Sequence, residues 1–195
     1  MPSAHAIFDR AGYLLTLLIS TLGMVALCMA GSHIVADFIE PGVPTANITT
    51  GVKGVVRIMS NARQGGKGPV DASIITVNGT IDFRPCFGRN TKQIFVMLVV
   101  QYATAQFARN ELTILDHIIT RPENGVVTLK DAAEYMIEDA VSDSLIGNPT
   151  VTVQVRYHLM AYSGWSPLRD VDAANGGVAK VVMPKTYSDR ITYGG

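Results

Sequence analysis

The stretch "NTKQIFVMLVVQYAT", residues 90–104, sets seven consecutive apolar residues, Ile94 to Val100, between polar ends. As a strand, seven residues extend only about 23 Å, at roughly 3.3 Å per residue. A transmembrane helix needs about 20 apolar residues, so this run is too short to cross a bilayer. Its β-branched and aromatic content favours a strand buried on both faces. The stretch therefore predicts a scaffold strand inside a folded domain.

A longer apolar stretch, Ala11 to Ser32, lies near the N-terminus and contains no charged residue. As a helix, its 22 residues would extend roughly 33 Å, enough for a bilayer core of about 30 Å. The alternative is a cleaved signal peptide, with small residues between Ala30 and Ala36 as its cleavage region. The apolar run is longer than the roughly 7–15 residues of a signal peptide, and its start is poorly basic. We therefore predict a retained signal-anchor helix.

The charges that flank this stretch predict its orientation. Arg10 precedes it, and Asp37 and Glu40 follow it. The positive-inside rule then places the N-terminus in the cytosol and the C-terminal part outside or in a lumen. The predicted organisation is a cytosolic N-terminus over 1–10, a transmembrane helix over 11–32, a stalk over 33–50 and a lumenal domain over 51–195.

The overall composition excludes some classes of partner. Basic and acidic residues balance at 16 each, so no nucleic-acid partner is expected. Of the two cysteines, Cys28 lies in the membrane stretch and Cys86 is alone in the exported part. The exported domain is therefore expected to fold without an internal disulfide, which about 155 residues can do.

Short strands separated by glycine and proline predict a β-sandwich-like domain. The expected strands are 52–59, 73–83, 94–100, 112–120, 126–129 and 178–183. The loop "NARQGGKGPVD" lies at 61–71, and Asn124-Gly125 suggests a hairpin between 112–120 and 126–129. Residues 128–143 have the composition of one short helix, capped at Thr128.

Residues 151–159 show the clearest alternation of the chain. Val151, Val153, Val155, Tyr157 and Leu159 alternate with Thr152, Gln154, Arg156 and His158. This period of two predicts a strand with one dry and one wet face, as in a sandwich sheet.

A search for catalytic motifs identifies no nucleophile elbow, phosphate loop or zinc-protease motif. Asp116 and His117 resemble a fragment of a triad, but neighbouring strand residues point to opposite faces and would not share a proton. Trp165 is interpreted as a packed aromatic rather than a ligand-stacking one, and "RQGGKG" as a loop rather than an anion site. No catalytic, cofactor-binding or metal-binding residue is expected.

Two sequons, Asn47-Ile-Thr49 and Asn78-Gly-Thr80, are candidate N-glycosylation sites if the domain is lumenal. A third triplet, Asn148-Pro149-Thr150, is disqualified by its proline.

Residues 90–119 carry a more specific pattern. It consists of Asn90-Thr91-Lys92-Gln93, the apolar strand, Tyr102, Thr104, Asn110, Ile114, Asp116, Ile118 and Ile119. Upstream lie Thr80, Asp82, Phe83 and Phe87, and downstream lie Pro184, Thr186 and Tyr187. This order, together with the N-terminal anchor, resembles the family of signal peptidase complex subunit 3, accessory subunits of the endoplasmic reticulum signal peptidase. Arg89 and Leu115 depart from the family pattern, which has tryptophan at both positions.

The resemblance implies a non-catalytic, single-pass type II subunit of the endoplasmic reticulum membrane. Its implied partners are the catalytic serine-peptidase subunit, the other subunits of the complex, membrane lipid and, as a further candidate, the translocon. Its implied role is to scaffold the catalytic subunit during signal-peptide removal. Two alternatives stay open: a membrane-anchored β-sandwich binding module of receptor or adhesion type, and a membrane-bound hydrolase.

Overall fold

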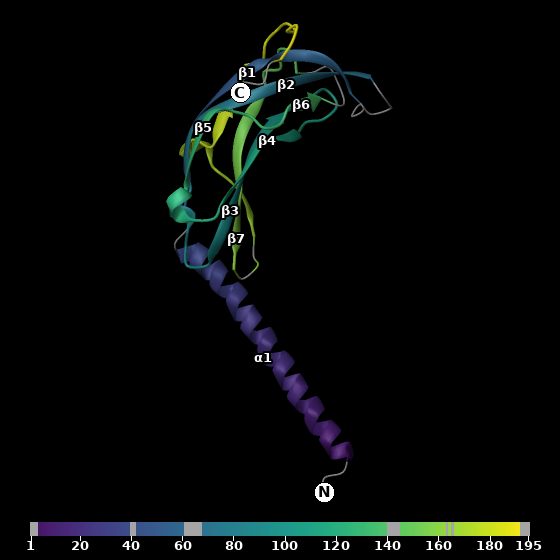
Figure 1. Ribbon diagram of the computed structural model, residues 1–195, viewed down its shortest axis with the longest axis vertical. Helices are drawn as coiled ribbons and strands as arrows, with labels where there is room; N and C mark the ends of the chain where they lie inside the picture. Colours follow the sequence, from purple (N-terminus) through teal and green to yellow (C-terminus); the bar gives the residue numbers. More distant parts are fainter. Residues whose placement is uncertain are drawn as a thin grey trace.

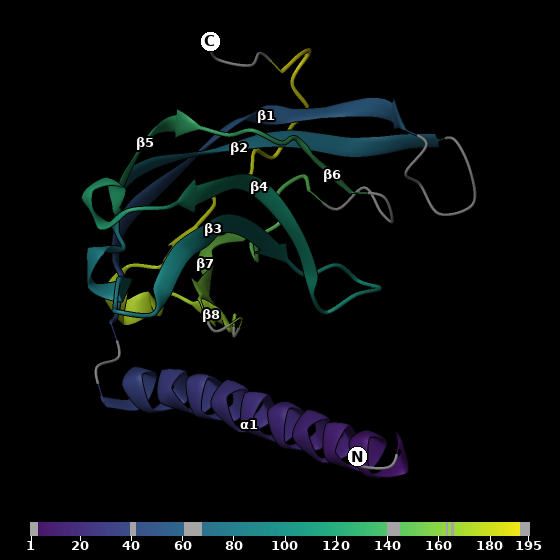
Figure 2. The ribbon, with the colours of Figure 1, turned by 60° about the horizontal axis from the view of Figure 1, so that its bottom comes forward.

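The computed structural model describes residues 4–39, 42–60, 68–139, 145–162, 164 and 166–191. One long helix precedes two antiparallel β-sheets that face each other (Figures 1 and 2). This mainly β architecture with an N-terminal apolar helix confirms the predicted fold class. Trp165 and most of the loop predicted at 61–71 lie outside the described residues.

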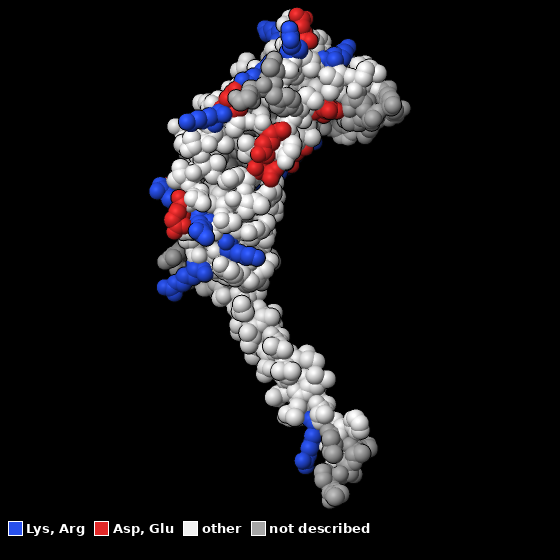
Figure 3. Space-filling model, in the orientation of Figure 1, with Lys and Arg blue, Asp and Glu red and all other residues white. Residues whose placement is uncertain are grey.

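Helix α1, Ala4–Ile39, extends away from the sheets (Figure 1). Its segment Phe8–Ser32 has a mean hydropathy of 2.1 and is long and apolar enough to cross a membrane. Beyond Arg10 the surface of this segment is free of charge along its length (Figure 3). Thr16 Oγ1 donates to the Gly12 carbonyl at 2.9 Å, so this hydroxyl is satisfied within the helix, as an apolar surrounding requires. The helix thus extends beyond the predicted 11–32 at both ends.

The first sheet has the strand order β1-β2-β5, with β6 also beside β2. The bounds are β1 Thr45–Ser60, β2 Gly68–Asp82, β5 Val126–Ala132 and β6 Ile137–Asp139. Strand β1 begins within the predicted stalk. A bulge between Val52 and Val55 bends β1, and Gly54 there adopts a φ of 122°, which favours glycine.

The second sheet has the order β4-β3-β7-β8, with β9 also beside β7. The bounds are β3 Thr91–Tyr102, β4 Asn110–Ile119, β7 Thr152–Ala161, β8 Leu168–Asp170 and β9 Val178–Lys180. Three short 3-10 turns, η1 Arg84–Cys86, η2 Pro122–Asn124 and η3 Ala173–Asn175, connect the strands.

The hydrophobic core lies between the sheets. Its largest fully buried side chains include Phe83, Ile75, Ile81, Ile94, Leu98 and Ile114. The ring of Phe83 packs edge-to-face on Tyr157, with 5.4 Å between the centroids. This pair joins the end of β2 to the middle of β7.

Strand β3 is buried on one face, and its other face is buried only at Val99, so the prediction of burial on both faces is wrong for most of the strand. Ile94, Val96 and Leu98 are buried against the first sheet, whereas Phe95 and Met97 are only half-buried. The reason lies in the architecture, because the outer face of a two-layer sandwich has no third layer to cover it.

Strand β7 shows the predicted alternation. Its dry-face residues, Val151 included, are buried, and Arg156 and His158 are half-exposed. The exception is Gln154, which is 9% exposed because its Nε2 donates to the Val171 carbonyl at 2.8 Å.

The helix predicted over 128–143 is wrong, since β5 and β6 occupy residues 126–132 and 137–139. Both strands pair with β2. Tertiary pairing thus overrides the local helix propensity. Asn78 Oδ1 accepts a hydrogen bond from the Asp131 backbone N–H at 2.7 Å and helps fix β5.

The hairpin predicted at Asn124-Gly125 is also wrong. Residues 122–124 form η2, and Gly125 has a φ of −68°, not the positive φ of a tight hairpin turn. The chain instead crosses here from β4 in one sheet to β5 in the other. This crossover leaves β4 and β5 as neighbouring strands that are not paired with each other.

The chain enters the sandwich beside η1. The Cys86 thiol donates to the Gly42 carbonyl at 3.3 Å. Gly42 packs so closely that a Cβ there would lie 2.0 Å from the Pro85 carbonyl oxygen, so a side chain would clash. The helix therefore joins the domain at its η1 end.

Candidate interaction sites

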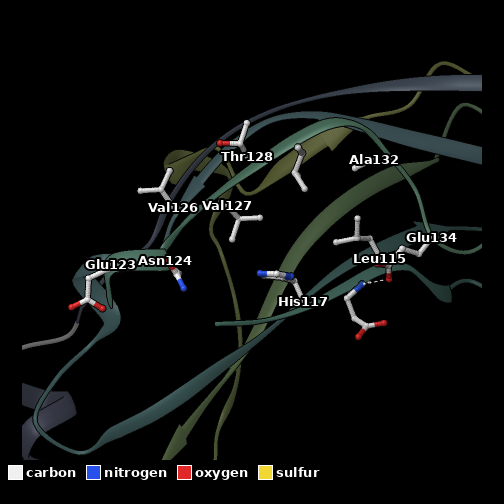
Figure 4. Close-up of a pocket in the computed structure, with 11 residues that line it drawn as sticks. Leu115, His117, Glu123, Asn124, Val126, Val127, Thr128, Ala132 and Glu134 are labelled. Atoms are coloured by element: carbon white, nitrogen blue, oxygen red, sulfur yellow. Dashed lines mark hydrogen bonds between the residues drawn. The ribbon is translucent and has the colours of Figure 1, made fainter. Parts of the chain in front are cut away.

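A groove of about 510 Å³ lies between β4 and the crossover to β5 (Figure 4). Its apolar lining is Leu115, Val126, Val127, Leu129 and Ala132, and its polar lining is Asp116, His117, Glu123, Asn124, Thr128 and Glu134. The groove exists because η2 carries the chain from one sheet to the other. Leu115 belongs to this lining and is 8% exposed.

The segment that follows β5 contacts the middle of the outer β4 edge, at Ile114 and Asp116. The backbone N–H groups of Glu134 and Tyr135 both donate to the Ile114 carbonyl, at 2.9 and 3.0 Å. The Tyr135 hydroxyl donates to Asp116 Oδ1 at 2.9 Å, and this hydrogen bond raises the pKa of Tyr135. Beyond Asp116, beside the groove, no other strand of the described chain pairs with this edge.

Asp116 and His117 lie on opposite faces of β4, as predicted. In the β3–β4 ladder His117 faces the buried Val96, and Asp116 faces the half-buried Met97. The imidazole of His117 projects into the groove (Figure 4), while Asp116 binds Tyr135. The two side chains therefore do not form a proton-transfer pair.

A contact between His158 and Ser166 was missed by the sequence analysis. Ser166 Oγ lies 3.5 Å from His158 Nδ1, which is also 3.3 Å from the Ser166 carbonyl oxygen. Among the described residues no carboxylate forms a hydrogen bond or ion pair with this histidine, so the contact lacks the acid that orients the base in a triad. The two residues come together because β7 and β8 pair with each other. Their separation in the sequence does not match a known catalytic motif, so the sequence did not predict the contact.

A second missed cluster lies at the far end of the first sheet. Asp71 on β2 is directly opposite Asp139 on β6, and both are buried. The Tyr187 hydroxyl donates to Asp71 Oδ1 at 2.9 Å, and the Tyr102 hydroxyl donates to Asp139 Oδ1 at 3.4 Å. Asp71 Oδ2 makes no hydrogen bond with the described part of the chain.

The surroundings of these carboxylates favour a structural role. Burial is the main cause that raises the pKa of Tyr102, and the nearby Asp139 raises it further. Burial likewise raises the pKa of Tyr187, and its hydrogen bond to Asp71 adds to this. The Arg57 guanidinium lies 5.0 Å from the centre of the Tyr187 ring. Because Asp71 and Asp139 are 0% and 2% exposed, a substrate could not reach them.

An ion-pair network ties the outer face of the second sheet. Arg156 on β7 binds Glu111 on β4 at 3.0 Å and Asp170 on β8 at 2.6 Å. The hydrogen bond from Arg156 lowers the pKa of Glu111. The network joins three strands of the second sheet, β4, β7 and β8.

The two sequons lie side by side in the β1–β2 ladder. Asn47 faces Thr80, and Thr49 faces Asn78, with all four residues exposed on one face. Both asparagines are thus accessible in the folded domain. Within the described residues no group of three or more His, Cys, Asp or Glu could hold a metal ion.

The chain is similar to known proteins over almost its whole length. The family described as "Signal peptidase subunit" matches residues 4–185. Signal peptidase complex subunit 3 of Caenorhabditis elegans is 28% identical over 94% of this chain and 97% of its own. The subunits of that name from Homo sapiens and Gallus gallus are 29% and 28% identical, each over 89% of this chain and 92% of their own.

Proposed function

The chain belongs to the signal peptidase subunit family, and from that premise we propose that it is a non-catalytic accessory subunit of the signal peptidase complex. In this role it scaffolds the catalytic serine-peptidase subunit, which removes signal peptides from proteins entering the endoplasmic reticulum. The observation that carries the proposal is the family match, which spans both the apolar helix and the β-sandwich.

The geometry of the polar residues supports a role without catalysis. A serine-type peptidase needs a nucleophile, a base and an oxyanion site that converge on one accessible point. Here Asp116 and His117 lie on opposite faces of β4, and in the described chain no carboxylate contacts the His158–Ser166 pair. In this proposal the peptidase chemistry belongs to another subunit.

The helix and its flanking charges support a single-pass type II topology. Residues 1–10 are cytosolic in this proposal, 11–32 form the membrane core of α1, 33–50 connect it to the domain, and 51–195 form the lumenal sandwich. The membrane is that of the endoplasmic reticulum. The partners are the catalytic subunit, the other subunits of the complex and membrane lipid, with the translocon as a further candidate.

Affinity purification of the tagged full-length chain in mild detergent tests the proposal. We expect the catalytic serine-peptidase subunit and signal-peptide cleavage activity to co-purify, and the isolated chain to have no such activity. Recovery with cell-surface partners and without a peptidase would support the binding-module alternative. Cleavage by the isolated chain would support the hydrolase.

A further inference from the structure

We propose that the open end of β4, residues Asp116 to Ile119, is completed by an extended segment of another subunit of the complex, which carries a basic side chain into the adjacent groove. This inference rests on the proposed function and adds the place and chemistry of one subunit contact. Such strand addition uses main-chain hydrogen bonds for affinity and side-chain pockets for specificity.

The backbone geometry of β4 defines the open edge. The Ile114 carbonyl and the Asp116 N–H point away from β3, because their partners lie in the 134–135 segment. In an antiparallel strand the outward residues alternate, so Ile118 also directs its N–H and C=O outward. In the part of the chain that the structure describes, no strand other than β3 pairs with β4.

Two other outer strands of the sandwich are protected, β1 by contacts with other parts of the chain and β8 by its short length. Along β1, the Ser188 N–H donates to the Val55 carbonyl at 2.8 Å, and Thr50 Oγ1 donates to the Lys180 carbonyl at 2.8 Å. At the far side of the second sheet β8 is only three residues long. Native proteins cover or shorten such edges because an uncovered edge is a template for pairing. Among the described residues the end of β4 has neither kind of protection, which supports a partner that covers it.

The groove beside this edge selects the chemistry of the partner. Three carboxylate residues, Asp116, Glu123 and Glu134, belong to its lining, and no lysine or arginine does. Val126 is 43% exposed and Ile118 is 51% exposed, so apolar surface flanks the same edge. An extended segment that alternates an apolar residue with lysine or arginine complements both features.

Ile118→Pro tests the hydrogen bonds of the edge. Proline removes an N–H that points outward and is tolerated at such edge positions, so the β3–β4 ladder is retained. We expect recovery of the subunit that supplies the segment, with the tagged full-length chain, to fall about tenfold, the effect of one lost hydrogen bond with some strain. Ile118→Thr keeps the N–H and is the matched control. Equal recovery with both variants would overturn the proposal.

Glu134→Lys tests the charge of the groove. We expect weaker recovery of the partner, whereas Asp189→Lys, the same charge change at an exposed residue that does not line the groove, should have no effect. Equal recovery with these two variants would show that the partner does not place a basic side chain in the groove.

Hydrogen exchange of backbone amides can be measured on the unmodified full-length chain. This test therefore does not depend on whether the variants fold. The Ile118 amide should exchange at least about tenfold more slowly in the purified complex than in the chain alone. A photo-reactive residue in place of His117 should cross-link to an extended, lysine- or arginine-containing segment of another subunit. Unchanged exchange in a complex that still co-purifies would overturn this contact and leave the proposed function intact. A cross-link to a second copy of the chain or to the signal peptide would also overturn it.

Discussion

Tyr187, close to the end of the described chain, donates its hydroxyl hydrogen to the fully buried Asp71, 2.9 Å away on β2. The contact fastens the segment after β9 across the end of the first sheet. It also gives a buried carboxylate one of its few partners, because Asp71 Oδ2 makes no hydrogen bond within the described residues. Tyr187 belongs to the Pro184-x-Thr186-Tyr187 pattern, so this sequence feature has a structural reason.

Tyr187→Phe should lower the free energy of unfolding of the sandwich by about 1–3 kcal/mol, because it leaves a buried carboxylate with one partner fewer. Tyr162→Phe makes the same chemical change at a residue that is 68% exposed and should be neutral. Denaturant unfolding of both variants in detergent provides the comparison. Equal stabilities would show that the Tyr187 hydroxyl does not support Asp71.

Val96→Asp should unfold the domain. Val96 is 1% exposed, and a carboxylate there would lose its hydration without gaining a partner, at a cost of several kcal/mol. Met97→Asp, one residue along on the outer face, should cost much less, and Lys92→Ala should stay within about 0.5 kcal/mol. The readouts are the abundance of the catalytic subunit and cleavage per assembled complex. If Val96→Asp assembled normally yet cleaved poorly, the strand would act on substrate and the scaffold role would be wrong.

Single alanine substitutions of Asp116, His117, His158 or Ser166 should not abolish signal-peptide cleavage in complexes that assemble. The physical reason is that these four residues do not converge on one point in the fold. Turnover per assembled complex is the quantity to measure, because His117 lies in the proposed contact groove and its loss can reduce assembly. A loss of turnover with normal assembly at any of the four would contradict the non-catalytic role.

The two sequons should carry at most one glycan on each chain. Asn47 and Asn78 are diagonal neighbours on one face of the β1–β2 ladder, with Cα atoms roughly 7–8 Å apart, so two bulky glycans would collide. Gel mobility before and after endoglycosidase, for the wild type, Asn47→Gln and Asn78→Gln, gives the number of glycans. Two removable glycans on one chain would refute this steric argument.

Protease added to sealed endoplasmic reticulum microsomes should leave almost the whole chain intact. The charge-free run from Ala11 to Ser32 and the preceding Arg10 predict that the sandwich is lumenal. After detergent opens the vesicles, the same protease should degrade the chain, which is the control for accessibility. Digestion to a short membrane stub in sealed vesicles would reverse the orientation.

Features that depend on local composition could be read from the sequence. The uncharged run of α1 and the two-residue alternation of β7 predict their elements directly, since each pattern matches the periodicity or length of one structure. The separation of Asp116 from His117 follows from the same alternation. The family resemblance, which depends on the order of motifs between Asn90 and Ile119, was likewise available before the fold.

Tertiary structure decided the features that depend on which strands become neighbours. Residues 128–143 have helical composition, but 128–132 and 137–139 pair as strands with β2, because this pairing satisfies backbone groups that a local helix would leave open on β2. The crossover of the chain from β4 to β5 creates the groove and leaves the end of β4 without a neighbouring strand in the described chain. The contacts of Asp71 with Asp139 and Tyr187 join residues 68 and 116 positions apart in the chain. Sequence periodicity reports which face of a strand is buried, but not which distant strand lies beside it, and that pairing determines the surface a partner meets.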